Sequence, residues 1–268
     1  MNQFGLAGWA LAFAVSGSAW ASSGHVAIDA AQAYVAKQQA KVVGAYDVGL
    51  KDFLVVKVKG QTQAGTSMLL VSKDGKLMTN QMFDLSSGQA KPYLRQFEAV
   101  LSGPEIAAFV ADFRPEQTIT FKKGDGSREL TVLSDPNCPY CKSLERDILA
   151  HLDNVTIHVL MFPFLGPDSV EKANRIWCAD DPQQAWHNWM VEDIAPPPAP
   201  SASCRYDTDY VTASTAQMAI SGVPVVIVHA NSQIVRSGIS LPELTAVMAL
   251  PKGQSRLPGV KEIKFKPF

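Results

Sequence analysis

Apolar and polar residues alternate over much of the N-terminal third, where they predict a small antiparallel α+β unit. Residues 53–58 and 67–72 have the composition of strands, and Asp74-Gly75 supplies a turn before a further strand over 77–83. A short amphipathic helix is predicted upstream, over 25–40. Its expected apolar face consists of Val26, Ile28, Ala33, Tyr34 and Val35.

From residue 91 to 113 the apolar spacing becomes helical. Leu94, Phe97 and Leu101 follow a helical period, and Gly103-Pro104 marks a break before a second helical run over 106–113. Two interpretations are open: a helical connector between two domains, or the first helix of the second domain.

The pattern beyond residue 117 predicts an α/β domain. Strands are expected over 118–121, 129–134 and 155–162, with a helix over 143–152 that completes a β-α-β unit. A mostly helical stretch over 169–191, a hairpin over 223–236 and a last helix over 241–250 follow. Residues 195–203 are rich in proline and predict a stiff loop. The basic tail over 251–268 is expected to be a solvated extension.

Composition narrows the classes of function. The 268 residues are 47% hydrophobic and 18% charged, which suits two globular domains. The formal net charge of −1 provides no overall field for nucleic acid, and the five histidines are scattered singly without a metal-binding cluster.

Residues 1–21 have the pattern of a cleaved signal peptide. An uncharged apolar run ends in small residues and Ala19-Trp20-Ala21, a cleavage pattern before Ser22. No Lys or Arg precedes the run, so an uncleaved anchor and a buried helix stay open as alternatives. Export would place the mature chain in an oxidising compartment.

The chain has four cysteines, at positions 138, 141, 178 and 204. An even number in an oxidising compartment favours disulfides, and the chain itself holds Cys138 close to Cys141. The expected pairs are therefore Cys138–Cys141 and Cys178–Cys204.

Cys138-Pro139-Tyr140-Cys141 lies between a predicted strand and a predicted helix, so Cys138 is expected at a helix N-terminus. Free backbone N–H groups and the helix dipole favour the thiolate there, and the thiolate is the form that attacks disulfides. Pro139 is tolerated because the first turn does not use its missing N–H. Cys138 is thus the candidate nucleophile, and Cys141 is the candidate resolving thiol. A zinc site and a purely structural disulfide are the competing interpretations.

Cys178 and Cys204 are expected to form a structural disulfide. In the chain-entropy model, closing this loop stabilises the fold by roughly 3–4 kcal/mol. A second redox pair that exchanges electrons with the first is the functional alternative.

Pro224 precedes the β-branched run Val225-Val226-Ile227-Val228. A turn proline at the start of a strand is one interpretation. Combined with the upstream cysteine motif, a cis Pro224 facing the dithiol is favoured, where its missing N–H leaves the neighbouring backbone free for an extended substrate.

The segment 133–144, which contains the cysteine motif, resembles the active-site segment of the periplasmic disulfide isomerases of the DsbC/DsbG family. The run Ile176-Trp177-Cys178-Ala179 with Cys204 resembles the second disulfide of that family. Ser221-Gly222-Val223-Pro224 resembles its cis-proline loop, and residues 68–84 resemble its small dimerisation domain.

This resemblance implies a cystatin-like dimerisation domain over 22–90, a helical linker over 91–116 and a thioredoxin-fold catalytic domain with a helical insertion over 117–268. It also implies a V-shaped periplasmic homodimer that acts on misoxidised exported proteins. A membrane reductase of the DsbD type would keep the dithiol reduced, and neither a metal nor a cofactor is needed.

Two departures from the family concern positions that contact the thiolate. Val223 stands where the family has Thr, as in the oxidase DsbA, and Pro139-Tyr140 matches the DsbG branch. Pro139, Tyr140 and Val223 are therefore expected to tune the redox properties. A DsbA-like oxidase and a periplasmic chaperone with a peptide-binding cleft are the alternative functions.

Overall fold

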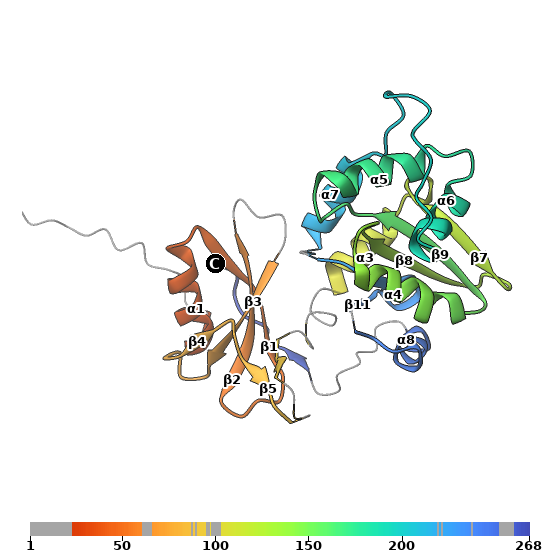
Figure 1. Ribbon diagram of the computed structural model, residues 1–268. Coiled ribbons are helices and arrows are strands. Elements are labelled where there is room, and N and C mark those ends of the chain that lie inside the picture. The colour runs from red at the N-terminus through yellow and green to blue at the C-terminus, as the bar shows by residue number, and fades with distance from the viewer. Residues whose placement is uncertain are drawn as a thin grey trace, which may run out of the picture.

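The computed structural model describes residues 23–60, 66–86, 88, 90–94, 97, 103–218, 220, 222–236, 238–251 and 260–268. The signal peptide expected over 1–21 lies outside these residues, as do parts of the helix expected after residue 91. Within the described residues the chain forms two five-stranded sheets and one two-stranded ribbon (Figure 1).

The first sheet has the order β12-β1-β2-β3-β4, with every ladder antiparallel. Its strands are β1 (Ala40–Asp47), β2 (Phe53–Gly60), β3 (Thr66–Ser72), β4 (Met78–Thr79) and β12 (Lys261–Glu262). The predicted strands over 53–58 and 67–72 are confirmed as parts of β2 and β3. The sequence did not predict β1, because Gly44 and the register shift between Val42 and Gly44 interrupt its alternation.

The strand expected over 77–83 is shorter than predicted. Only β4 joins the sheet, and β5 (Phe83–Asp84) turns away to pair with β6 (Lys91–Pro92) in the ribbon. The helical pattern expected from residue 91 is therefore wrong at its first two residues. The turn after β3 is confirmed: Gly75 has a positive φ of 73°, and its N–H donates to the Ser72 carbonyl.

Helix α1 (Val26–Ala36) covers one face of the first sheet, as Figure 1 shows. Its expected apolar face is only partly correct, because Val26, Ala33 and Tyr34 are exposed. The buried stripe consists of Ala27, Ile28, Ala31, Gln32 and Val35. Ala27 and Ala31 in this stripe are small, so the helix can approach the sheet closely. The prediction was wrong here because it favoured large apolar side chains for the buried face.

The end of the tail is not a solvated extension, so that expectation is wrong for residues 260–268. β12 pairs with Tyr46 and Asp47 at the end of β1, and the Ile263 N–H donates to the Ala45 carbonyl at 2.8 Å. Ile263, Phe265 and Phe268 pack against the core beneath α1. In Figure 1 the C-terminal end of the chain accordingly lies beside α1.

Helix α3 (Gly103–Ala111) contacts both parts of the molecule. Its Ile106 and Phe109 are buried in the core of the second sheet. At its start, the Glu105 carboxylate accepts a hydrogen bond from Lys57 Nζ on β2 at 2.6 Å. Its apolar face thus packs as the first helix of the second part, while one ion pair ties it to the first sheet.

The second sheet has the order β11-β10-β8-β9-β7, in which β8 and β9 are parallel and the other ladders are antiparallel. Its strands are β7 (Ile119–Lys123), β8 (Arg128–Ser134), β9 (Val155–Met161), β10 (Val225–Val228) and β11 (Gln233–Arg236). The α-helices that follow α3 are α4 (Pro139–Asp147), α5 (Pro167–Trp177), α6 (Pro182–Met190), α7 (Thr208–Gln217) and α8 (Leu241–Met248). Short 3-10 turns are η1 (Pro115–Gln117), η2 (Leu149–His151) and η3 (His229–Asn231).

This arrangement confirms the predicted β-α-β unit, which consists of β8, α4 and β9, and the hairpin of β10 and β11. Helix α4 begins at Pro139, four residues earlier than the predicted start at 143. The cysteine motif therefore forms the first turn of the helix. Among the residues that the structure describes, no helix combines the length and the apolar character needed to cross a lipid bilayer.

Candidate active site

Cys138 caps the N-terminus of α4, where the sequence placed it. Its backbone is extended (φ −78°, ψ 118°), and its carbonyl accepts hydrogen bonds from the N–H groups of Cys141 and Lys142 at 3.0 and 3.1 Å. Pro139 occupies the first helical position, as expected from its missing N–H. The Cys138 sulfur thus lies at the helix end that stabilises negative charge.

The structure does not contain the expected Cys138–Cys141 disulfide, because both thiols are free. The two thiols also differ in their access to solvent. Cys138 is 4% exposed, whereas Cys141 is completely buried. Burial raises the pKa of the Cys141 thiol well above its usual value, while the backbone N–H of Asp135 and the Ser134 side chain act in the opposite direction. This arrangement suits an outer sulfur that meets the substrate and an inner sulfur that stays protonated until it is needed.

The peptide bond between Val223 and Pro224 is cis, as the sequence predicted. The Val223 carbonyl oxygen lies 4.0 Å from the Cys138 sulfur, so the proline loop faces the dithiol. β10 begins at the next residue, and the pairing of Val225 with Leu133 on β8 fixes this loop beside the cysteine motif. The structure thereby brings together Cys138, Cys141, Val223 and Pro224.

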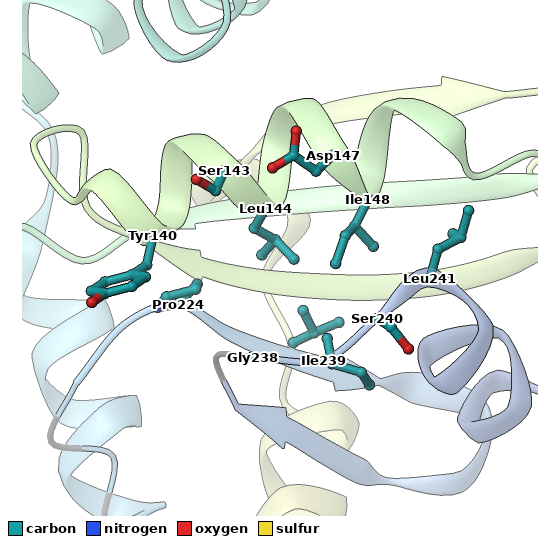
Figure 2. Close-up of a pocket in the computed structure, with 11 residues that line it drawn as sticks. Tyr140, Ser143, Leu144, Asp147, Ile148, Pro224, Gly238, Ile239, Ser240 and Leu241 are labelled. Atoms are coloured by element: carbon teal, nitrogen blue, oxygen red, sulfur yellow. The ribbon is translucent and has the colours of Figure 1, made fainter.

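A groove with a volume of about 440 Å³ runs along α4 from Tyr140 and Pro224, the neighbours of the dithiol. Figure 2 shows Tyr140 and Pro224 at one end and Leu241 at the other. The floor and walls are mainly apolar, with Leu144 on α4 and Ile148 just after it facing Ile239 across the groove. Tyr140 is 72% exposed, so its ring is available to a bound molecule.

Asp135 fixes the loop between β8 and α4, and the sequence analysis did not identify it. Its buried carboxylate accepts hydrogen bonds from the Asn137 N–H at 2.7 Å, the Leu165 N–H at 2.8 Å and the Ser169 hydroxyl at 2.8 Å. The Asp135 carbonyl accepts from the Cys138 N–H at 3.1 Å. The run Asp135-Pro136-Asn137 is typical of such a turn and was the available signal.

Trp189 on α6 supports the same loop from the other side. Its indole N–H donates to the Pro136 carbonyl at 2.6 Å. The ammonium of Lys142 lies 3.8 Å from the centre of the Trp189 ring, and the same lysine forms an ion pair with Asp193. Sequence reasoning missed Trp189 because it lies 51 residues after Cys138, and only the packing of α6 beside α4 brings it to the site.

Cys178 and Cys204 form the predicted disulfide, with their Cα atoms 6.0 Å apart. It joins the end of α5 to the end of the proline-rich loop, where Tyr206 also packs against Trp177. Because both of these cysteines are disulfide-bonded, they cannot supply two further thiolates to a zinc ion bound by Cys138 and Cys141. The zinc interpretation therefore has no ligand set among the four cysteines.

Comparison with known proteins agrees with this geometry. The family described as thioredoxin-like domain matches residues 115–249, which include the whole second sheet and the site. The chain belongs to the thioredoxin-like family. Its thioredoxin-like fold positions the cysteine motif at the start of α4 and the cis-proline loop opposite.

Among curated relatives, the thioredoxin-like chain is 40% identical over 112 residues to a probable thiol:disulfide interchange protein DsbC of Bordetella pertussis. This match covers 42% of the chain and 39% of that relative. A probable DsbC of Bordetella avium is 31% identical over 174 residues, covering 65% of the chain and 59% of the relative. The chain thus spans less than two thirds of the length of these relatives. They confirm the resemblance to the DsbC proteins.

Solved structures similar to the thioredoxin-like chain include a disulfide interchange protein from Neisseria gonorrhoeae. It is 28% identical, with a TM-score of 0.46, and the match covers 51% of this chain and 96% of that one.

Proposed function

We propose that this protein is an exported thiol–disulfide oxidoreductase that isomerises or reduces wrong disulfides in other exported proteins. One observation carries the proposal: Cys138 caps a helix N-terminus, lies beside the completely buried Cys141 and is opposite a cis-proline loop. The curated relatives named for thiol:disulfide interchange support the same activity.

In the first step, the Cys138 thiolate attacks one sulfur of a substrate disulfide. A new bond joins Cys138 to that sulfur, the substrate disulfide breaks, and the electron pair leaves on the second substrate sulfur. During isomerisation, a substrate thiolate later attacks the mixed disulfide and releases Cys138 again, so no net electrons are transferred.

Reduction uses Cys141 instead. The Cys141 thiolate attacks the Cys138 sulfur, forms the Cys138–Cys141 disulfide and releases the reduced substrate. Two electrons must then be returned, and we assign this step to a membrane reductase of the DsbD type.

The groove that begins at Tyr140 and Pro224 is the proposed substrate site. Its apolar walls suit side chains of an unfolded or partly folded chain, and Pro224 leaves the neighbouring backbone free to pair with an extended segment. Tyr140 would lie against such a segment, while Pro139 and Val223 would adjust the stability of the Cys138 thiolate. The Cys178–Cys204 disulfide has a structural role in this proposal, because it fixes the proline-rich loop to α5.

We assign residues 22–90 to a cystatin-like dimerisation domain, whose sheet residues 260–268 complete, 91–116 to the linker and the rest of 117–268 to the catalytic domain. Periplasmic location after removal of residues 1–21 and a V-shaped homodimer complete the proposal. The dimer is supported by β4, which pairs with only Leu70 and Val71 of β3 and leaves Thr66–Leu69 without a described partner on that side.

Two observations favour alternative functions of the same site. Val223 before the cis-proline favours a DsbA-like oxidase, and the apolar groove would also serve a chaperone that holds unfolded chains.

Substitution of Cys138 by Ala tests the proposed chemistry. We expect the rate at which a scrambled multi-disulfide protein regains activity to fall to the uncatalysed rate, because the attacking sulfur is removed. Cys141→Ala is the matched control, and it should accumulate a covalent mixed disulfide with the substrate, visible on a non-reducing gel. Catalysis that persists in the Cys138→Ala protein would refute the proposal.

A further inference from the structure

Ser134 is the last residue of β8 and lies four positions before Cys138. The residue is 1% exposed, and its hydroxyl has no hydrogen-bond partner among the described residues. Leaving a buried hydroxyl unpaired costs about 1–3 kcal/mol, so such groups are rare and call for an explanation.

The functional group that the Ser134 side chain affects is the thiol of Cys141. The chain leaves β8 at Ser134, turns through the loop fixed by Asp135 and enters α4, whose first turn brings Cys141 back over the strand end. The Ser134 side chain and the Asp135 N–H both act on the Cys141 sulfur, where they favour its charged form against the effect of burial. A buried hydroxyl without a hydrogen bond in the resting protein is thus in a position to act on the sulfur whose charge changes during resolution.

We infer that Ser134 is a catalytic residue of the second half-reaction, in which its hydroxyl donates a hydrogen bond to the Cys141 thiolate as that thiolate forms. This inference rests on the proposed thiol–disulfide exchange. A donor positioned in a site without water stabilises charge that develops only during the reaction.

The attack of Cys141 on the mixed disulfide needs no further reagent. The Cys141 thiol loses its proton, its sulfur attacks the Cys138 sulfur, and the mixed disulfide breaks with its electron pair on the departing thiolate. The proton passes to that thiolate or to solvent, and the Ser134 hydroxyl keeps its own proton throughout.

Ser134 should not affect the first half-reaction. The Cys138 sulfur lies at the helix N-terminus and 4.0 Å from the Val223 carbonyl, on the outer side of the dithiol. The inference therefore predicts a selective defect, which a merely structural role would not produce.

The aromatic disulfide dithiobis(nitrobenzoate) separates the two half-reactions. Attack by Cys138 on this compound releases one coloured thiolate, and attack by Cys141 on the resulting mixed disulfide releases a second. In the full-length reduced protein, we expect Ser134→Ala to leave the first phase unchanged and to slow the second about tenfold, equivalent to about 1.4 kcal/mol. The pH midpoint of the second phase should rise, because the thiolate has lost a donor.

Ser134→Thr retains a hydroxyl and should restore most of the second-phase rate. Ser214→Ala, which removes a buried hydroxyl from α7, should change neither phase. If the Ala variant does not fold, Ser134→Gly carries the same expectation.

An unchanged second phase in the variants without the hydroxyl, or an equal slowing of both phases, would overturn the role of Ser134. Absence of the first phase in the unmodified protein would instead overturn the proposed function itself. Cys141→Ala calibrates the measurement, since it should release only one equivalent.

Discussion

Glu145 on α4 is a half-buried carboxyl group that the proposed reaction does not use. Its Oε1 accepts a hydrogen bond from the indole N–H of Trp186 at 2.9 Å. Burial raises the pKa of Glu145 to about 7, against the smaller opposing effects of this hydrogen bond and of Lys123. The folded protein therefore binds this proton more tightly than the unfolded chain does.

We expect Glu145→Gln to stabilise the protein at pH 8 but not at pH 4. Because the pKa of Glu145 is raised, its contribution to the free energy of unfolding is complete below pH 4.5, the pKa in the unfolded chain. This contribution is lost as the pH rises through about 7. Glutamine retains an oxygen for Trp186 and does not ionise, so the free energy of unfolding at pH 8 should rise by about 2 kcal/mol. Denaturant unfolding at both pH values measures this. Glu171→Gln on the surface of α5 is the control, and equal changes at both pH values would contradict the assignment.

At the residue scale, the sequence predicted the groups whose type and spacing define their chemistry. Cys138, Cys141 and Pro224 fall into this class, since a strand before the motif and a proline before a β-branched run are local signals. Asp135, Ser134 and Glu145 were missed because their roles depend on burial. Polar residues beside a turn or on a helix are normally solvated, and only the packing of α5 and α6 around α4 removes them from water.

At the element scale, β12 is the feature that the sequence least anticipated. Five basic residues after position 251 suggested a solvated tail, although Ile263, Phe265 and Phe268 carry an apolar pattern among them. The strand forms because the edge of β1 and the core beneath α1 are available, and both belong to a segment more than 200 residues earlier in the chain. Such a long-range pairing leaves no local signature.

Removal of residues 260–268 should destabilise the first sheet. Three partly buried apolar side chains together contribute about 3 kcal/mol at the usual free energy per buried area. The truncated protein should unfold at lower denaturant concentration, and amide hydrogen exchange should accelerate in β1. Phe265→Ala with Phe268→Ala should reproduce most of the loss, whereas Lys264→Ala with Lys266→Ala should have little effect because both lysines are exposed. Matching stability of the two double variants would contradict this role of the tail.

At the scale of the whole molecule, the described residues form two sheets with their own cores, and the contacts that relate these sheets include two of particular interest. One is the ion pair between Lys57 on β2 and Glu105 on α3, and the other is the return of the tail to β1 after α8. The thioredoxin-like part contains the dithiol, the groove and the Cys178–Cys204 disulfide. We propose that this part performs thiol–disulfide exchange and that the first sheet joins two protein chains in the dimer.

The direction of electron flow distinguishes the proposed isomerase or reductase from an oxidase with the same dithiol. An isomerase must rest with Cys138 as a free thiol, because only a thiolate attacks a substrate disulfide, whereas an oxidase must rest as the Cys138–Cys141 disulfide. Acid quenching of intact cells, followed by alkylation of free thiols and mass measurement of the protein, gives the resting state directly. We predict that Cys138 and Cys141 are both alkylated while Cys178 and Cys204 are not, and a resting Cys138–Cys141 disulfide would contradict the proposed function.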